Sequence, residues 1–273
     1  MVVLKHVDVM SAAKIAAVVN LILGLIVTVL GFIALVGVDL VFGLSGRVIG
    51  IFAIVLIIIP LLLFAAGFIF VAIEAWLYNV LAQKFGGVKL EFKKNRLVNI
   101  DPTTAAKLAA MAGVIIGFIA GLIFGIGAAA RGSFLGLALI IVLPIAFALI
   151  GFIAAAISVV VYNFLAVKIG GIGLNFKGSE LKSIDIISFA KIEAVISAIW
   201  GLVQGVFIAL RAIHPMIYSA AGNAELQRLG VAAIIVVPIL YFITSFIGAA
   251  IEAWIYNWLV PKVGGVKLIF SKK

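Results

Sequence analysis

The chain has 273 residues, of which 66% are hydrophobic and only 11% are charged, and its formal net charge is +10. A soluble domain has about 45–50% apolar and about 25% charged residues, because its surface must be solvated. The composition therefore excludes an ordinary soluble protein and predicts a membrane protein. The absence of cysteine excludes disulfides, thiolate zinc sites and cysteine nucleophiles. Two histidines leave little material for a histidine-based metal site.

Six apolar segments are long enough to cross a bilayer, which takes about 20 residues. We place them near residues 14–36, 48–80, 107–129, 133–164, 190–212 and 229–259. Lipid offers no partners for free backbone groups, so continuous apolarity predicts helices. The first segment is too long for the apolar part of a cleaved signal peptide, and we expect it to remain in the mature protein. The predicted fold class is an all-α membrane protein with six transmembrane helices.

One motif opens each odd-numbered segment: an aspartate, a serine or threonine three residues later, and a lysine three residues after that. The copies are Asp8, Ser11 and Lys14; Asp101, Thr104 and Lys107; and Asp185, Ser188 and Lys191. A glycine follows ten residues after each lysine, and a proline stands in each even-numbered segment. These residues are Gly24, Gly117, Gly201, Pro60, Pro144 and Pro238.

Each even-numbered segment ends on a Tyr-Asn pair, which is followed by a lysine and a glycine pair. The Tyr-Asn pairs are Tyr78-Asn79, Tyr162-Asn163 and Tyr256-Asn257, and the glycine pairs are Gly86-Gly87, Gly170-Gly171 and Gly264-Gly265. Because so many offsets recur, we predict a single polytopic membrane domain of three tandem two-helix repeats with pseudo-threefold symmetry. The repeats are residues 1–92, 93–176 and 177–273.

Structural roles explain these motifs more simply than a ligand site does. The aspartates are suited to cap helix N-termini, and the lysines after them can extend to the membrane surface. The tyrosines stand where an interfacial aromatic belt is expected. The glycine pairs can supply the left-handed residue that ends a helix, and the prolines either bend the even-numbered helices or mark their start.

Short alternating runs after the glycine pairs predict a small β layer. We expect residues 88–92 and 96–100 to form one hairpin and residues 174–176 and 181–184 to form another. Residues 2–7 resemble the second strand of such a hairpin, and residues 266–270 resemble the first. The two ends of the chain are therefore expected to pair with each other and complete a ring of hairpins.

Basic residues are concentrated on one side of the predicted membrane. An even number of spans puts both termini and the loops between repeats on the same side, together with all but four of the 20 lysine and arginine residues. The four on the other side are Arg47, Arg131, Arg211 and Arg228. Because positive charge marks the cytoplasmic side, we expect a multi-pass protein of the cell membrane with cytoplasmic termini. That side can attract anionic lipid headgroups, whereas scattered lysines do not predict nucleic-acid binding.

The opening and closing motifs resemble a two-helix transmembrane domain of unknown function from actinobacterial membrane proteins. The matching residues are Asp101, Pro102, Thr104 and Lys107 in the middle copy and Tyr78, Asn79, Ala82, Gly86, Gly87 and Val88 in the first. Val9 and Ile186 replace the proline in the other copies. The resemblance implies three such hairpins fused over nearly the whole chain. It implies no activity, because the family has none assigned.

Polar residues at membrane depth are the first candidates for function. Glu74 and Glu252 lie one helical turn before their Tyr-Asn pairs, and Ser158 holds the same position in the middle copy. One interpretation is an interfacial ion pair of each glutamate with a lysine such as Lys14 or Lys191. The other is a cation or proton site formed by the two carboxylates and the serine around the threefold axis.

A glycine series in the third segment has the spacing that lets helices approach closely. It consists of Gly113, Gly117, Gly121 and Gly125. The series predicts packing within the helix bundle, and the alternatives are a homo-oligomer contact or a pore lining. The other polar residues of the spans do not recur at one position, so they predict no symmetric pore. They are Asn20, Thr28, Gln204, Thr244 and Ser245.

The sequence contains no soluble-enzyme motif, so we expect no enzyme, no catalytic residues and no cofactor. The favoured function is a membrane scaffold or accessory subunit that contacts lipid and either further copies of itself or other membrane proteins. The alternative is a small ion or proton channel or transporter with Glu74, Ser158 and Glu252 near its cytoplasmic mouth. Such a pathway normally has a polar lining, which is scarce here. The loop at 214–228 breaks the repeat and is either a docking surface or an ordinary insertion.

Overall fold

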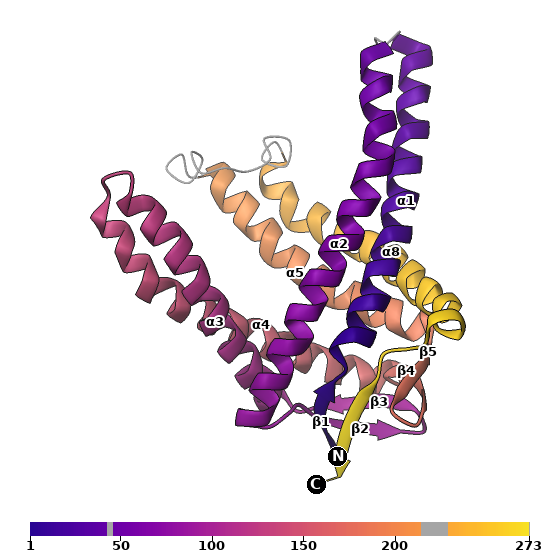
Figure 1. The fold of residues 1–273 in the computed structure, drawn as a ribbon, viewed down its shortest axis with the longest axis vertical. Coiled ribbons are helices and arrows are strands. Elements are labelled where there is room, and N and C mark those ends of the chain that lie inside the picture. The colour runs from indigo at the N-terminus through magenta and orange to yellow at the C-terminus, as the bar shows by residue number, and fades with distance from the viewer. Residues whose placement is uncertain (43–45, 214–228, 273) are drawn as a thin grey trace.

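The structure is a computed structural model that describes residues 1–42, 46–213 and 229–272 (Figure 1). Its helices are α1 (Val9–Phe42), α2 (Gly46–Phe85), α3 (Pro102–Ala129), α4 (Leu139–Ile169), α5 (Ile186–Ile213) and α8 (Ala233–Val263), with the short 3-10 helices η1 (Phe134–Ala138) and η2 (Gly230–Ala232) before α4 and α8. Within the described residues, six helices are long and apolar enough to cross a membrane, as expected of a multi-pass membrane protein. The loop at 214–228 lies outside the described residues.

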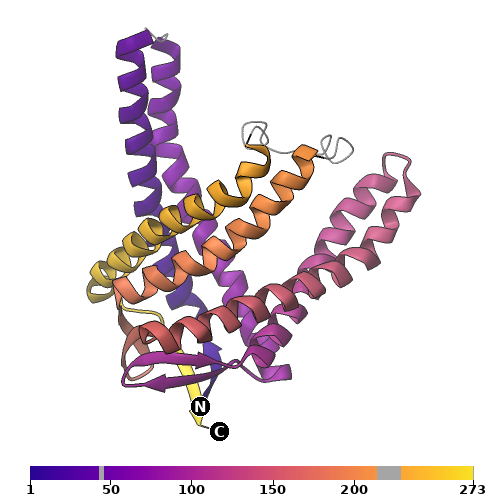
Figure 2. The ribbon, with the colours of Figure 1, turned by 180° about the vertical axis from the view of Figure 1, so that it is seen from behind.

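The long helices pack in pairs, α1 with α2, α3 with α4 and α5 with α8. The pairs diverge from a common base, so that the described helices do not form one closed bundle (Figures 1 and 2). Apolar clusters join neighbouring pairs near the base, as where Leu77 and Leu81 of α2 meet Leu108 of α3. Most of the length of each pair is therefore uncovered by the other two.

The base is a β layer of antiparallel strands: β1 (Val2–Val7), β2 (Lys89–Lys93), β3 (Arg96–Ile100), β4 (Ile172–Lys177), β5 (Glu180–Ile184) and β6 (Leu268–Lys272). Their order is β5-β4-β3-β2-β1-β6. β1 and β6 pair from Val2 with Lys272 to Val7 with Leu268, which confirms the predicted pairing of the two chain ends.

The two edges of this sheet also approach each other. Glu180 forms a bridge with Lys267, and the N–H of Leu181 donates to the carbonyl oxygen of Val266 at 2.9 Å. These contacts occupy Val266 and Lys267, so β6 begins at Leu268 rather than at the expected residue 266. The layer thus comes close to a closed ring of hairpins.

One phenylalanine from each hairpin meets the other two at edge-to-face angles. Phe92, Phe176 and Phe270 have ring centroids 5.9, 5.8 and 5.6 Å apart. Edge-to-face contacts favour the quadrupoles of aromatic rings and add to the burial of their apolar surface. This aromatic cluster joins the three hairpins, and the sequence analysis did not anticipate it.

The shared prolines lie inside α2, α4 and α8 and do not start them. Each faces the repeat glycine of the partner helix. A Cβ added to Gly24, Gly117 or Gly201 would lie 3.0, 2.7 or 3.0 Å from the Cα atom of the facing proline. Glycine therefore lets the two helices come together where proline has removed a backbone hydrogen bond.

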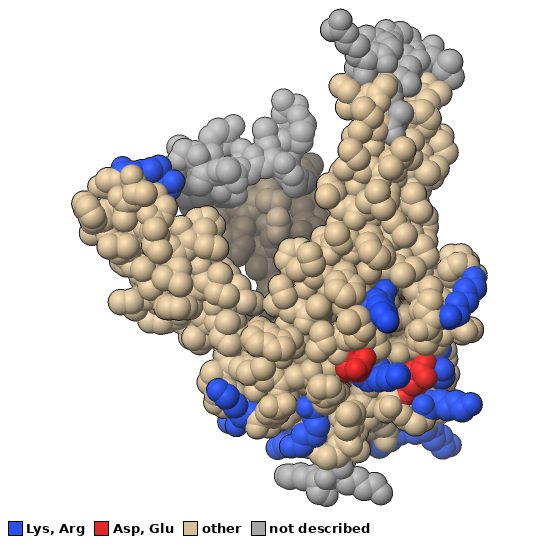
Figure 3. Space-filling view, in the orientation of Figure 1, with Lys and Arg blue, Asp and Glu red and all other residues tan. Residues whose placement is uncertain are grey.

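Charged side chains gather at the β layer and at the nearby helix ends, whereas uncharged side chains cover most of the visible helix surface (Figure 3). Exposed apolar residues stand along the pairs, including Ile57, Ile123 and Phe207. Large apolar patches of this kind are typical of surfaces that contact lipid or other helices. The charged β layer is thus suited to water, whereas the apolar helix surfaces are suited to lipid or to other helices.

Candidate functional site

The asparagine of each Tyr-Asn pair fastens a helix to the β layer. The side chain of Asn79 accepts a hydrogen bond from the N–H of Val7 and donates one to its carbonyl oxygen, both at 2.8 Å. The same two bonds join Asn163 to Ile100 and Asn257 to Ile184. An amide that satisfies both polar groups of one backbone residue is a structural clamp, not a free ligand group.

The tyrosines of these pairs also bind backbone. The Tyr78 hydroxyl donates to the carbonyl oxygen of Leu4 at 2.7 Å and accepts from the N–H of Val88 at 3.2 Å. Equivalent bonds join Tyr162 to Leu97 and Ile172, and Tyr256 to Leu181 and Val266. The prediction of an interfacial tyrosine belt is wrong, because strands of the β layer cover these side chains and use their hydroxyls.

The aspartates cap helices as predicted. Their carboxylates accept hydrogen bonds from the N–H groups of Ser11, Thr104 and Ser188 at 2.8, 2.7 and 2.8 Å. These backbone bonds lower the pKa of Asp8 and Asp101, and for Asp185 the Ser188 hydroxyl is the largest cause of the lowered pKa. The hydroxyls of Ser11, Thr104 and Ser188 accept from the N–H groups of Lys267, Lys89 and Gly173 in the β layer.

The glycine pairs serve two backbone requirements. The first glycines, Gly86, Gly170 and Gly264, have φ angles of 81°, 91° and 85°, as predicted for residues that end helices. A Cβ on the second glycines would lie 1.7, 2.1 and 1.9 Å from the carbonyl oxygens of Leu4, Leu97 and Leu181, which only a glycine permits. The lysines Lys14, Lys107 and Lys191 are exposed in the opening turns of α1, α3 and α5.

The glycine series of α3 is buried against the helix pair to which it belongs. A Cβ on Gly113, Gly117, Gly121 or Gly125 would lie 2.3, 2.5, 2.6 or 2.9 Å from a backbone oxygen of α4 or η1. This confirms the prediction that the series serves packing. The surface that a homo-oligomer contact or a pore would need is taken up by the facing helix.

The structure separates Glu74, Ser158 and Glu252. Glu74 lines a cavity of about 390 Å³ between α2 and α3, Ser158 accepts a hydrogen bond from the indole N–H of Trp200 in α5, and Glu252 faces a groove described below. Within the described part of the chain, neither glutamate has a lysine or arginine nitrogen within 4 Å. The predicted ion pairs are wrong, because the lysines at the helix starts extend outward at the base.

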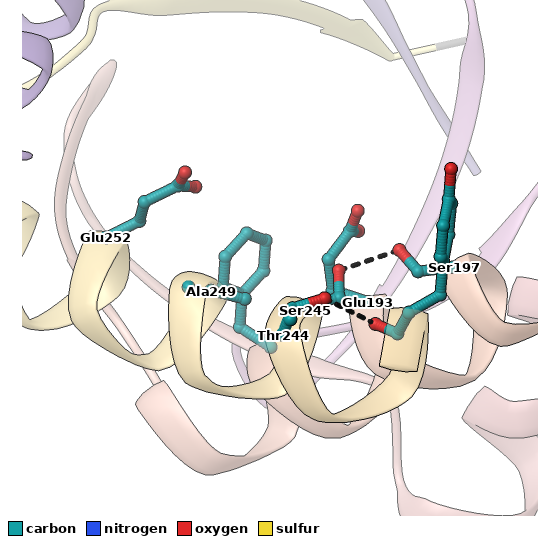
Figure 4. A pocket seen from close by; sticks show the side chains of 9 residues that line it. Glu193, Ser197, Thr244, Ser245, Ala249 and Glu252 are labelled. Atoms are coloured by element: carbon teal, nitrogen blue, oxygen red, sulfur yellow. Dashed lines mark hydrogen bonds between the residues drawn. The ribbon is translucent and has the colours of Figure 1, made fainter. Parts of the chain in front are cut away.

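A polar groove lies on the α5–α8 pair. This cavity of about 520 Å³ is lined by Glu193, Ser197, Tyr241, Thr244, Ser245 and Glu252, with Phe189, Gly248 and Ala249. Glu193, Ser197 and Glu252 project to the same side of the two helices (Figure 4). The hydroxyls of Ser197 and Ser245 hydrogen-bond to each other at 2.7 Å. The groove therefore offers hydroxyls and two carboxylates, with no cation paired to either carboxylate among the described residues.

The groove continues alongside the first helix pair. A second cavity of about 410 Å³ shares Phe189 and Glu252 with it and is also lined by Ala16 and Asn20 of α1 and Val71 of α2. Within the described residues, no three histidine, aspartate or glutamate side chains come together as a metal site would require. The groove therefore places polar side chains of α5 and α8 beside the first helix pair.

The sequence analysis missed Glu193 and Ser197 and treated Thr244 and Ser245 as scattered. One signal was present: Glu193 and Ser197 are four residues apart and Ser245 and Glu252 are seven apart, so each pair shares a helix face. Whether these two faces lie next to each other depends on the seam, that is, on the line of residues along which α5 and α8 pack. The sequence alone did not identify that seam.

Comparisons of this chain with protein-family models, with curated proteins and with solved structures found no match.

Proposed function

We propose that the protein is a non-enzymatic membrane scaffold or accessory subunit that holds partners through its helix faces and its β layer. The observation that supports this is the divergence of the helix pairs from one base (Figures 1 and 2). Each pair is packed internally but exposes apolar side chains such as Ile123 and Phe207. Surfaces of this kind suit lipid and other transmembrane helices.

The proposal includes an orientation and a repeat organisation. The basic base lies in the cytoplasm with both termini and can contact anionic headgroups. The chain consists of three copies of one hairpin, residues 1–92, 93–176 and 177–273, about a pseudo-threefold axis. The recurring bonds of the capping aspartates and the Tyr-Asn pairs support this organisation. The resemblance to the two-helix transmembrane domain rests on the same residues and stays a prediction.

Photo-crosslinking in the native membrane tests the scaffold. A photoreactive residue at Ile123, which is 64% exposed, should give adducts with discrete proteins. The matched control is Ala106 of the same helix, which is 1% exposed and should give none. An adduct with a second copy of the chain would identify a homo-oligomer. A protein that purifies without partners and conducts ions in liposomes would contradict the proposal.

The second candidate is a small channel or transporter for ions or protons, and the polar groove is the observation that favours it. Glu74, Ser158 and Glu252 have different neighbours in the structure, which gives less support to a channel entrance that all three residues line together. Ion and proton flux into liposomes tests this candidate. Flux that is unchanged by Glu74→Gln and Glu252→Gln together would count against it.

A further inference from the structure

Three polar residues of the groove have no polar counterpart on the other two helix pairs, although the first pair carries Asn20 and Glu74 at the positions of Ser197 and Glu252. At the same offsets from the repeat lysine and proline, those pairs carry apolar residues in place of Glu193, Tyr241 and Thr244. The replacements are Ala16 and Ala109, Leu63 and Phe147, and Ala66 and Ile150. Polar side chains are costly at membrane depth unless they are paired. The additional polar residues on the α5–α8 pair therefore indicate a polar partner at that pair.

Both carboxylates lie more than one helical turn inside their helices and not at the helix ends. Glu252 stands 11 residues before Val263 at the end of α8, which is about 16 Å along the helix. Glu193 stands seven residues after Ile186 at the start of α5, which is about 10 Å along it. Both lie inside candidate spans. A basic group that binds them therefore has to lie alongside the helices rather than at the β layer.

The groove has the length and surface of a seam for a helix. Tyr241, Ser245, Gly248 and Glu252 follow one face of α8 at spacings of three and four residues, over about 16 Å. A Cβ added to Gly248 would meet nothing within 4 Å, whereas one on Gly113 would lie 2.3 Å from a backbone oxygen. Small residues allow close helix approach. The seam beside Gly248 is thus open, and it is longer than a small cation needs.

We propose that this groove binds a transmembrane helix of a partner protein that carries a lysine or arginine at the depth of Glu193 and Glu252. The inference rests on the proposed scaffold function and names its class of partner. A basic side chain complements two carboxylates that have no cation paired to them among the described residues, and the helix backbone fits beside Gly248. A second copy of this chain is not the complement, because its described helices present glutamates at this depth and lysines at their base ends.

Synthetic helices test the inference with the full-length protein in nanodiscs of phosphatidylcholine. The peptides are polyleucine helices with one lysine, one leucine or one glutamate at the matching depth. The chain has no cysteine, so Ile247→Cys, at an exposed position of α8 outside the groove lining, introduces a unique site for a fluorescent acceptor. The lysine peptide should bind about tenfold more tightly than the leucine peptide, the upper range for polar contacts between membrane helices. The glutamate peptide should bind more weakly than either.

Matched variants assign that preference to the groove. Glu193→Gln combined with Glu252→Gln should remove the lysine preference, whereas Glu74→Gln, at the position equivalent to Glu252, should retain it. Gly248→Leu keeps the carboxylates and fills the open seam, so it should weaken the binding of the lysine peptide and of the leucine peptide by the same factor. Retained thermal unfolding of each variant separates loss of binding from loss of fold.

Three results would overturn the inference: equal binding of the lysine and leucine peptides, complete displacement of the lysine peptide by tetraethylammonium, and energy transfer between copies labelled at this site. The second would assign the groove to a small organic cation and the third to a second copy of the chain. If protein adducts at Ile123 persist while the lysine preference is absent, the groove inference fails and the scaffold stands. If the adducts are absent, the scaffold itself fails.

Discussion

The α3–α4 and α5–α8 pairs are fastened to the β layer by the same bonds but are joined differently along their length. In α3–α4, a Cβ on Gly113 or Gly151 would lie 2.3 or 2.8 Å from a backbone oxygen of the facing helix. At the same offsets α5–α8 has Ser197 and Ser245, whose hydroxyls hydrogen-bond at 2.7 Å. One seam consists of backbone against backbone, and the other includes polar side chains.

The comparison of the two pairs shows which positions of a helix pair are free to vary. The serine or threonine after each capping aspartate, the Tyr-Asn pair and the second glycine all contact the β layer, so their identity is tied to the base. The seam between the helices is free of that constraint. Glycine there brings the backbones together, whereas serine leaves room for neighbours such as Glu193 and Glu252 to form a polar groove.

The largest expected effect is that of crowding the glycine seam. A Cβ on Gly117 would lie 2.5 Å from the Leu143 carbonyl oxygen and 2.7 Å from the Cα atom of Pro144, so Gly117→Leu forces the backbones apart. Overpacking costs about 1–3 kcal/mol and more where backbone has to move, and we expect a loss of at least about 3 kcal/mol in unfolding by dodecyl sulfate. Gly127→Leu is the control, since its Cβ would meet only the Arg131 guanidinium, at 3.8 Å.

Loss of an asparagine clamp should cost the two pairs equally. Asn163→Leu and Asn257→Leu each leave one N–H and one carbonyl oxygen of the β layer without a partner. Unsatisfied buried groups cost about 1–3 kcal/mol, and we expect about 2 kcal/mol from each variant in the same unfolding assay. Markedly unequal losses would show that the bases of the two pairs differ as well as their seams.

The capping aspartates predict a shared dependence on pH. Hydrogen bonds to the carboxylates hold the pKa values of Asp101 and Asp185 below the ordinary value of 3.8. The carboxylates therefore stabilise the fold fully above that value, and the contribution is lost as the pH falls through the lowered pKa. Asp101→Ala and Asp185→Ala should each cost about 1 kcal/mol at pH 7 and less at pH 3. A cost that does not shrink in acid would contradict this assignment.

The smallest expected effect is on the serine seam. A double-mutant cycle of Ser197→Gly and Ser245→Gly changes the α5–α8 seam to the residues of α3–α4. Hydrogen bonds between membrane helices average about 0.6 kcal/mol in such cycles, and we expect a coupling free energy of that size between the two serines. A coupling of zero would mean that the hydroxyls do not hold the helices together, and the contrast between the seams would then be one of spacing alone.

The helix pairs and the β layer were predictable because motifs at fixed spacings and alternating apolar residues specify them. The spacing from Asp101 to Lys107 located a helix start, and the matching alternation of residues 2–7 and 266–270 located the pairing of the chain ends. The role of Tyr162 was mispredicted, because an aromatic residue near a helix end reads the same whether lipid or a strand covers it. The groove was not predictable, since it depends on how residues of α5 and α8, about 50 positions apart as for Ser197 and Ser245, face each other.

The pairing of β1 with β6 also sets an order of assembly. β1 is synthesised before β6, so this strand keeps one edge without its neighbour until residues 268–272 have left the ribosome. An unpaired edge is a template for pairing with other chains, and contacts between distant parts of a chain form slowly. The last strand therefore acts as a closing element: removing it would leave the helix pairs intact but open the base at β1 to association with neighbouring chains.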